Sequence, residues 1–189
     1  MAFLTEAAAR AAVQNRGVQF AESEIRKSAA TDLSTTFDVF LSHSFLDADL
    51  VVGIKELLEG QGLSVYIDWV EDQQLNRTQV TAKTAGILRT RMRNSRSLIF
   101  ATSSTSSGSK WMPWELGYFD GFRPNHAAIF PLVKTSGSGF PGQEYLGLYP
   151  YVEVIAFEQG PRQLGISTSD TTALPISGFP THGVRPPSG

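Results

Sequence analysis

The chain has 189 residues and a formal net charge of −2, from 16 basic and 18 acidic side chains, so it has no general electrostatic attraction for nucleic acids or acidic membranes. Hydrophobic residues make up 41% of the chain and charged residues 18%, which is enough apolar material for one folded domain with accessory segments. The lack of cysteine excludes disulfides, thiolate metal sites and cysteine nucleophiles, and it fits a reducing compartment.

The sequence shows no targeting or membrane signal. No apolar run approaches the roughly 18–20 residues of a membrane span. Residues 1–10 lack a basic stretch followed by an apolar one, which is the pattern of a secretory signal. We therefore expect a cytoplasmic protein whose partners include neither nucleic acid nor membrane.

Residues 1–35 are rich in alanine and in charged residues that favour helices. The apolar residues Val13, Val18 and Phe20 are not spaced to form one clear stripe. We predict an N-terminal helical arm that serves packing or oligomerisation rather than catalysis.

Residues 36–157 alternate between short apolar runs and helical patterns. The expected strands cover residues 37–41, 63–68, 97–101, 127–133 and 151–156. The expected helices run from Asp47 to a stop at Gly60, from Thr78 to Asn94, and from Ser109 or Lys110 through Phe119. This alternation predicts an α/β fold with a five-stranded parallel sheet and helices on both faces.

Ligands of such sheets bind beyond the carboxyl ends of the strands. The rule directs attention to Ser42-His43-Ser44, to Asp68-Trp69, and to the serine-rich stretch that follows Ala101. Residues 158–189 hold five glycines and five prolines in 32 positions and show no strand or helix pattern, so we predict a C-terminal tail or an extension wrapped on the domain.

The most specific motif lies in the third predicted helix. Trp111 and Glu115 are four residues apart and share one helical face. Pro113 is tolerated only in the first turn, which places the start of the helix near Ser109 and puts Glu115 beside the strand ends. Taken alone, Glu115 could equally be a surface glutamate beside core tryptophans.

Three motifs, in order and spacing, resemble the Toll/interleukin-1 receptor (TIR) domain family. They are Asp38-Val-Phe-Leu-Ser-His43, Val65-Tyr-Ile-Asp68, and the pair Trp111 and Glu115 after a serine-rich run. The resemblance covers residues 36–157, is closest to the bacterial branch, and implies the flavodoxin-like TIR fold.

The resemblance implies cleavage of the bond between nicotinamide and ribose in NAD⁺, which would be a substrate, with no other cofactor and no metal. The enzyme would be an NAD⁺ nucleosidase or ADP-ribosyl cyclase-type hydrolase that releases ADP-ribose, a cyclic ADP-ribose signal or a transferred adduct. Glu115 corresponds to the family's catalytic glutamate, and the expected substrate-binding residues are Ser42, His43, Tyr66, Asp68, Trp69 and Trp111.

A single carboxylate suffices for this reaction. Ordinary glycosidases need two, because a neutral leaving group must be protonated. The nicotinamide of NAD⁺ is already cationic and departs neutral, so one carboxylate can hold the ribose and stabilise the developing oxocarbenium charge. Aromatic side chains such as Trp111 and Tyr66 could stack on the flat rings and keep water sparse.

Several features also have structural interpretations. A histidine at a strand end, such as His43, is more often a hydrogen-bonded structural group than a base, so we expect it only to line the pocket. The basic residues Lys83, Arg89, Arg91, Arg93 and Arg96 form a solvated face or a subunit contact more often than a pyrophosphate clamp. Residues 70–78 lack the Gly or Pro-Gly turn common in the family; Asn76 could supply the turn.

The alternative to an enzyme is a non-catalytic TIR scaffold or effector that acts by TIR–TIR interaction. A receiver domain is excluded because strand 97–101 is not followed by a phosphoacceptor aspartate. A dinucleotide-binding Rossmann domain is excluded because no Gly-x-Gly-x-x-Gly motif follows the first strand. The resemblance further implies a homo-oligomer held by TIR–TIR contacts. It also implies antiphage defence in a system such as Thoeris, with a downstream effector that senses the nucleotide product.

Overall fold

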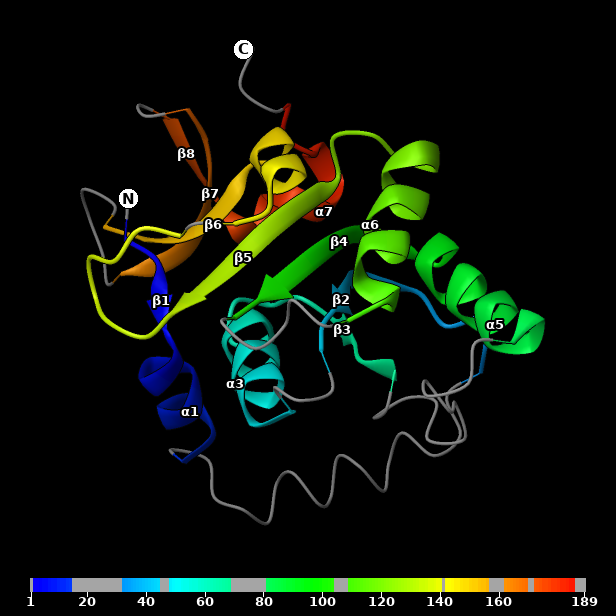
Figure 1. The fold of residues 1–189 in the computed structure, drawn as a ribbon, viewed down its shortest axis with the longest axis horizontal. Coiled ribbons are helices and arrows are strands. Elements are labelled where there is room, and N and C mark those ends of the chain that lie inside the picture. The colour runs from blue at the N-terminus through cyan, green and yellow to red at the C-terminus, as the bar shows by residue number, and fades with distance from the viewer. Residues whose placement is uncertain are drawn as a thin grey trace.

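A mostly parallel sheet crosses the middle of the molecule in the computed structural model (Figure 1). The structure describes residues 2–14, 32–44, 48–68, 81–103, 109–140, 142–156, 162–169 and 172–185. The central strands are β2 (Phe37–Ser42), β3 (Val65–Tyr66), β4 (Ser95–Thr102), β5 (Ala127–Val133) and β6 (Tyr151–Ile155). They lie in the order β3-β2-β4-β5-β6 and all neighbours pair in parallel, which confirms the predicted five-stranded parallel sheet.

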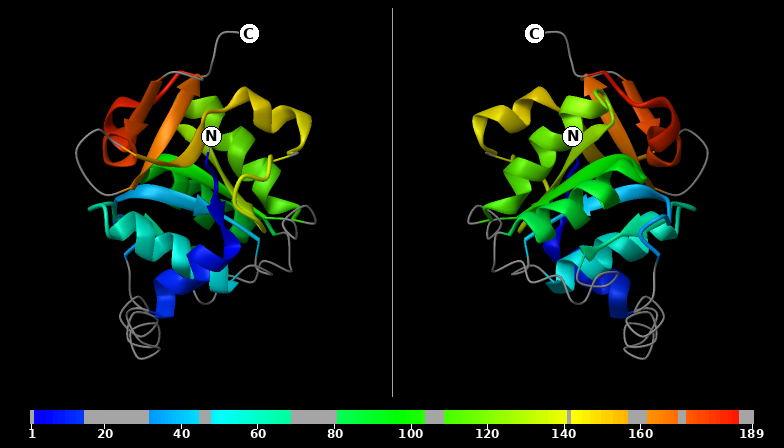
Figure 2. Two further views of the ribbon diagram at one scale, coloured as in Figure 1. Left: turned by 90° about the vertical axis from the view of Figure 1, so that its left-hand side faces the viewer. Right: turned by 90° about the vertical axis from the view of Figure 1, so that its right-hand side faces the viewer.

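Helices cover both faces of this sheet, as Figure 2 shows from two sides. Helix α3 (Ala48–Glu59) packs on one face, while α5 (Ala82–Arg93), α6 (Trp111–Phe122) and the short 3-10 helix η4 (Glu144–Leu148) lie on the other. Two apolar cores result, one on each face. The central strands are therefore mostly apolar, because both of their faces are largely buried.

The predicted helices begin and end close to the expected residues. Helix α3 ends at Glu59. In the turn that follows, Gly62 adopts a positive φ of 83°, which glycine accommodates without strain. Helix α5 starts after Thr81, whose side chain caps it by accepting a hydrogen bond from the Thr84 amide. Pro113 lies in the first turn of α6, as predicted.

The N-terminal segment adds to the sheet and then crosses onto α3. Strand β1 (Leu4–Thr5) pairs in parallel with the end of β5, and α1 (Glu6–Gln14) packs against α3. The helices approach so closely that a Cβ on Gly53 would overlap the backbone carbonyl of Ala9. The predicted helical arm is confirmed for residues 6–14, and the remainder of the arm, residues 15–31, lies outside the described residues.

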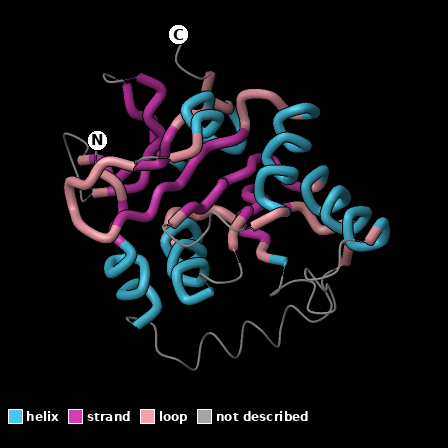
Figure 3. The backbone as a smooth tube through the Cα atoms, in the orientation of Figure 1, coloured by secondary structure: helices cyan, strands magenta, loops and turns pink. Residues whose placement is uncertain are grey.

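Residues 158–189 contain strands and helices that their sequence pattern did not indicate. Strands β7 (Gln163–Ser169) and β8 (Thr172–Pro175) extend the sheet beyond β6 with antiparallel pairing, and η5 (Ile176–Gly178) and α7 (Phe179–His182) follow. In the tube view of Figure 3 this added hairpin continues the sheet. The division of the chain at residues 35 and 157 stays a prediction, and the described parts of both terminal segments pack on the central sheet.

None of the described helices has both the length and the apolar composition of a membrane span.

Candidate active site

The predicted site residues gather where parallel strands end. Ser42 and His43 close β2, and Asp68 follows the adjacent strand β3. The first turn of α6 lies against the same sheet and brings Glu115 to this edge. The carboxyl edge of the sheet thus joins polar groups that are far apart in the sequence, as the rule for open α/β sheets predicts.

Glu115 is bound to the end of the first central strand. The Ser42 hydroxyl donates a hydrogen bond of 2.6 Å to Oε2 of Glu115, and neither residue has exposed surface. Such a bond holds the carboxylate in one orientation, and hydrogen bonds to charged groups are stronger than those between neutral groups. Glu115 is therefore a buried acid with a fixed orientation and not a surface glutamate.

His43 and Asp68 form a second buried polar pair beside it. Nε2 of His43 lies 3.2 Å from Oδ1 of Asp68, and its Nδ1 lies 2.8 Å from the carbonyl oxygen of Leu41. Because the carbonyl can only accept, Nδ1 donates to it, and the contact of Nε2 with Asp68 is an ion pair when the ring carries a second proton. The pair ties the ends of β2 and β3 together, in keeping with the structural role expected for His43.

Tyr66 lies within the core on the same face of the sheet. It has no exposed surface; its ring stacks on Phe40 with centroids 5.1 Å apart, and the Arg91 guanidinium lies 5.4 Å from its centre. With its surroundings filled by side chains of its own chain, this arrangement does not favour Tyr66 as a surface for a substrate ring. Its predicted contact with substrate stays a prediction. Trp69, Asn76 and Ser104 lie outside the described residues.

Trp111 lines a groove of about 510 Å³ between the amino-terminal ends of α5 and α6. Its ring meets that of Trp114 edge to face, with centroids 5.4 Å apart. Arg89 and Lys110 add two positive charges to the same groove, and the Arg89 guanidinium lies 5.5 Å from the Trp114 ring centre. Aromatic faces beside cations suit a ligand that combines flat rings with negative charge.

The basic residues around α5 therefore have different roles. Arg91 is fully buried and donates to the carbonyl of Asp32. Arg93 donates to the Tyr118 hydroxyl, and Arg96 contacts Asp38. Arg89 alone of these lines the groove, so the sequence pattern of a basic helix did not separate structural from ligand-facing arginines.

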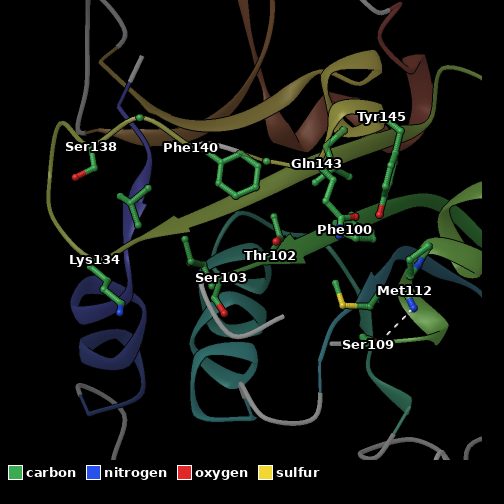
Figure 4. A pocket seen from close by; sticks show the side chains of 16 residues that line it. Phe100, Thr102, Ser103, Ser109, Met112, Lys134, Ser138, Phe140, Gln143 and Tyr145 are labelled. Atoms are coloured by element: carbon green, nitrogen blue, oxygen red, sulfur yellow. Dashed lines mark hydrogen bonds between the residues drawn. The ribbon is translucent and has the colours of Figure 1, made fainter. Parts of the chain in front are cut away.

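A second cavity, of about 350 Å³, lies on the other side of the first turn of α6 (Figure 4). It lies at the carboxyl ends of β4 and β5, and residues from 138–140 and 142–146 form another of its walls. Of the residues singled out in the sequence, Ser103, Ser109 and Pro113 line it. The other lining residues, including Tyr145 and Lys134, had no signal in the sequence, because separate segments of the chain contribute to the walls.

The structure differs from the sequence expectation in one respect. We expected Glu115 to face an open cleft, but it is fully buried and lines neither the groove at Trp111 nor the second cavity. Both hollows flank the turn of α6 that carries it. Glu115 is therefore not accessible to a ligand in this arrangement.

These features define a flavodoxin-like α/β domain with a buried acid at the carboxyl edge of its sheet. No family model matches the chain. It is 57% identical over 122 residues to a Bacillus cereus (strain MSX-D12) protein named "Probable 3' cyclic ADP-D-ribose synthase ThsB'". The matched residues make up 64% of this chain and 63% of that protein. It is also 32% identical over 83 residues to a Cytobacillus dafuensis protein named "Putative cyclic ADP-D-ribose synthase TIR2". These residues make up 43% of this chain and 22% of that protein.

The chain thus spans less than two thirds of the length of either relative. In its fold, its three motifs and these two matches the chain is similar to bacterial TIR-domain proteins.

Proposed function

We propose that this TIR domain cleaves the nicotinamide–ribose bond of NAD⁺ and closes the ADP-ribose part into a cyclic product. The observation that carries the proposal is the buried Glu115 held by Ser42 at the carboxyl edge of the sheet. Both relatives are named as cyclic ADP-D-ribose synthases, which supports the same chemistry here.

The reaction requires charge stabilisation more than proton transfer. As the glycosidic bond breaks, its electron pair moves to the pyridinium nitrogen, and nicotinamide leaves as a neutral molecule. The ribose becomes an oxocarbenium ion, whose positive charge a fixed carboxylate stabilises in a site without water. Glu115 supplies that carboxylate, and the hydrogen bond from Ser42 fixes its orientation before substrate arrives.

Binding of the substrate calls for aromatic surface and positive charge. The groove at Trp111 offers both, through Trp114, Arg89 and Lys110, next to the helical turn that carries Glu115. Trp111 remains our candidate for the contact with the nicotinamide ring. Ser42, His43 and Asp68 shape the edge of the site from the strand side.

The biological setting extends the proposal. A cyclic nucleotide made from NAD⁺ suits a signal in antiphage defence, and a downstream effector would sense it. Such an enzyme would act in the cytoplasm, where NAD⁺ is abundant, and would assemble through TIR–TIR contacts.

Incubation of the purified chain with NAD⁺, followed by mass spectrometry of the products, tests the proposal. We expect nicotinamide together with a product of the mass of cyclic ADP-ribose, which is one water lighter than ADP-ribose. Nicotinamide with linear ADP-ribose alone would establish a hydrolase instead. No release of nicotinamide, even at high protein concentration or under molecular crowding, would favour a non-catalytic TIR scaffold.

A further inference from the structure

The second cavity contains a polar group that the protein itself leaves without a partner. The hydroxyl of Tyr145 is buried and has no hydrogen-bond partner among the described residues. In Figure 4 the ring reaches down from η4 toward Phe100, and its hydroxyl lies among the lining side chains. Burial raises the pKa of Tyr145, so the hydroxyl keeps its proton and can donate as well as accept.

Leaving such a group unpaired costs free energy, which a ligand with a matching polar atom recovers. Tyr145 thus marks the cavity as a binding site rather than a packing defect. The cavity is open to its surroundings through the exposed segment that includes Lys134 and Ser138.

The walls of the cavity show what kind of ligand it fits. Phe100 and Met112 provide apolar surface below, and the ring of Phe140 projects from the loop above (Figure 4). Leu132 adds to the apolar lining. Lys134 lies exposed at the far end from Tyr145 and adds a positive charge. Apolar walls, a hydroxyl at one end and an ammonium at the other suit a flat base that carries a phosphate.

The cavity also adjoins Glu115. Met112 precedes Glu115 by one turn of α6. Phe100 is the parallel partner of Ser42, which holds the Glu115 carboxylate. A ligand in this cavity would lie beside the position that we assign to the reacting ribose.

Cyclisation makes a demand that hydrolysis does not. The bond to the ribose carbon must form from an atom of the same molecule, so the adenosine half must fold back beside the oxocarbenium ion. Positioning of that half raises the local concentration of the internal nucleophile over that of water. A pocket that holds the adenosine half beside the ribose therefore favours cyclisation over hydrolysis.

We propose, on the basis of the function proposed above, that this cavity holds the adenosine half of NAD⁺ folded back toward Glu115, and that Tyr145 thereby determines how much product is cyclic. The C–N bond to nicotinamide breaks with its electron pair retained by nicotinamide. The ribose carbon then bonds to an oxygen or nitrogen of the adenosine half, which releases one proton to solvent. Tyr145 acts as a positioning residue, through a hydrogen bond to the adenosine half.

The test compares Tyr145→Phe with the control Tyr149→Phe. Tyr149 lies on the same segment but outside the cavity lining, where its hydroxyl donates to Asp120 at 3.3 Å, and burial, together with Asp120, raises its pKa to about 12. We expect Tyr145→Phe to lower the ratio of cyclic to linear product roughly threefold to tenfold, the value of one buried hydrogen bond. The ratio for Tyr149→Phe should match the wild type.

Binding of adenosine monophosphate, measured by calorimetry, tests the cavity without turnover. Tyr145→Phe should weaken binding by a similar factor, while Lys134→Gln, a change at an exposed position, should weaken binding of adenosine monophosphate but not of adenosine. An unchanged product ratio together with unchanged affinity in Tyr145→Phe would overturn the proposal, as would equal effects in Tyr149→Phe. If the wild type released no nicotinamide, the proposed function would fail. Saturable binding of adenosine monophosphate that depends on Tyr145 would then still support the cavity as a nucleotide site. If that binding were absent as well, the proposed function and the proposed nucleotide site would both fail.

Discussion

Ser42 and Glu115, 73 positions apart in the chain, share a buried hydrogen bond of 2.6 Å that joins the end of β2 to the first turns of α6. The bond has two consequences. It fixes the only carboxylate of α6 that is fully buried among the described residues, and it links the strand motif to the helix motif of the sequence. Both stability and activity should therefore respond to changes at either residue.

Removal of the serine hydroxyl should cost stability. Ser42→Ala leaves a buried carboxylate oxygen without this donor, so we expect the free energy of unfolding to fall by about 1–3 kcal/mol. Urea denaturation measures the change. Ser34→Ala is a suitable control, because Ser34 is an exposed serine that also bonds a carboxylate, that of Asp32. Equal stability of Ser42→Ala and the wild type would show that the bond contributes nothing.

The contact between α1 and α3 gives a second prediction. Gly53→Ala places a methyl group against the backbone of Ala9, which cannot move without displacing α1, so we expect a loss of about 1–3 kcal/mol. Gly86→Ala on α5 meets no neighbouring atom and should instead stabilise the protein by about 0.5–1 kcal/mol. Thermal unfolding of the two variants distinguishes them. A Gly53→Ala variant as stable as Gly86→Ala would mean that α1 does not hold this position.

The ion pair between Arg10 and Asp49 anchors the same helix and predicts a pH dependence. The two side chains lie 2.5 Å apart at Nε and Oδ2, and the hydrogen bond from Arg10 holds the pKa of Asp49 below its ordinary value. A carboxyl group with a lowered pKa in the folded state stabilises the fold above its unfolded pKa of about 3.9, and this contribution disappears as the pH falls through the folded value.

In Arg10→Met, the pKa of Asp49 should rise toward the ordinary value, and the variant should lose stability relative to the wild type at neutral pH but not in strong acid. Carboxyl titration by NMR, together with denaturation at several pH values, measures both effects. Superimposable Asp49 titration curves in the two proteins would contradict the assignment.

Sequence periodicity predicted the central sheet because its strands are buried on both faces and read as continuous apolar runs. The hairpin of β7 and β8 was missed for a specific reason. Gly165 lies in β7 where the side chain of Ile155 packs over it, and Pro175 ends β8, which pairs on one side only. Glycine and proline are compatible with a strand in such places, although their frequency predicts an irregular segment.

The sequence indicated individual residues of the site but not the contacts between them. Ser42 and Glu115 were each singled out, yet only the fold shows that they bond to each other. Tyr66 was expected to stack on a substrate ring, and only the fold shows that the ring is buried in the core. The second cavity has no signature in the sequence, because Lys134 and Tyr145 come together only through the path of the segment between β5 and β6.

The most direct test of the account is nicotinamide release by Glu115→Gln, followed by chromatography, with Glu144→Gln as a control at an exposed position. Glutamine keeps the size of the side chain but removes its charge, so we predict a rate about 10²–10³-fold below wild type, as for loss of a group that stabilises transition-state charge. Glu144→Gln should retain full activity, and circular dichroism should confirm that both variants fold. Undiminished release by folded Glu115→Gln would contradict the assignment of Glu115 as the catalytic carboxylate.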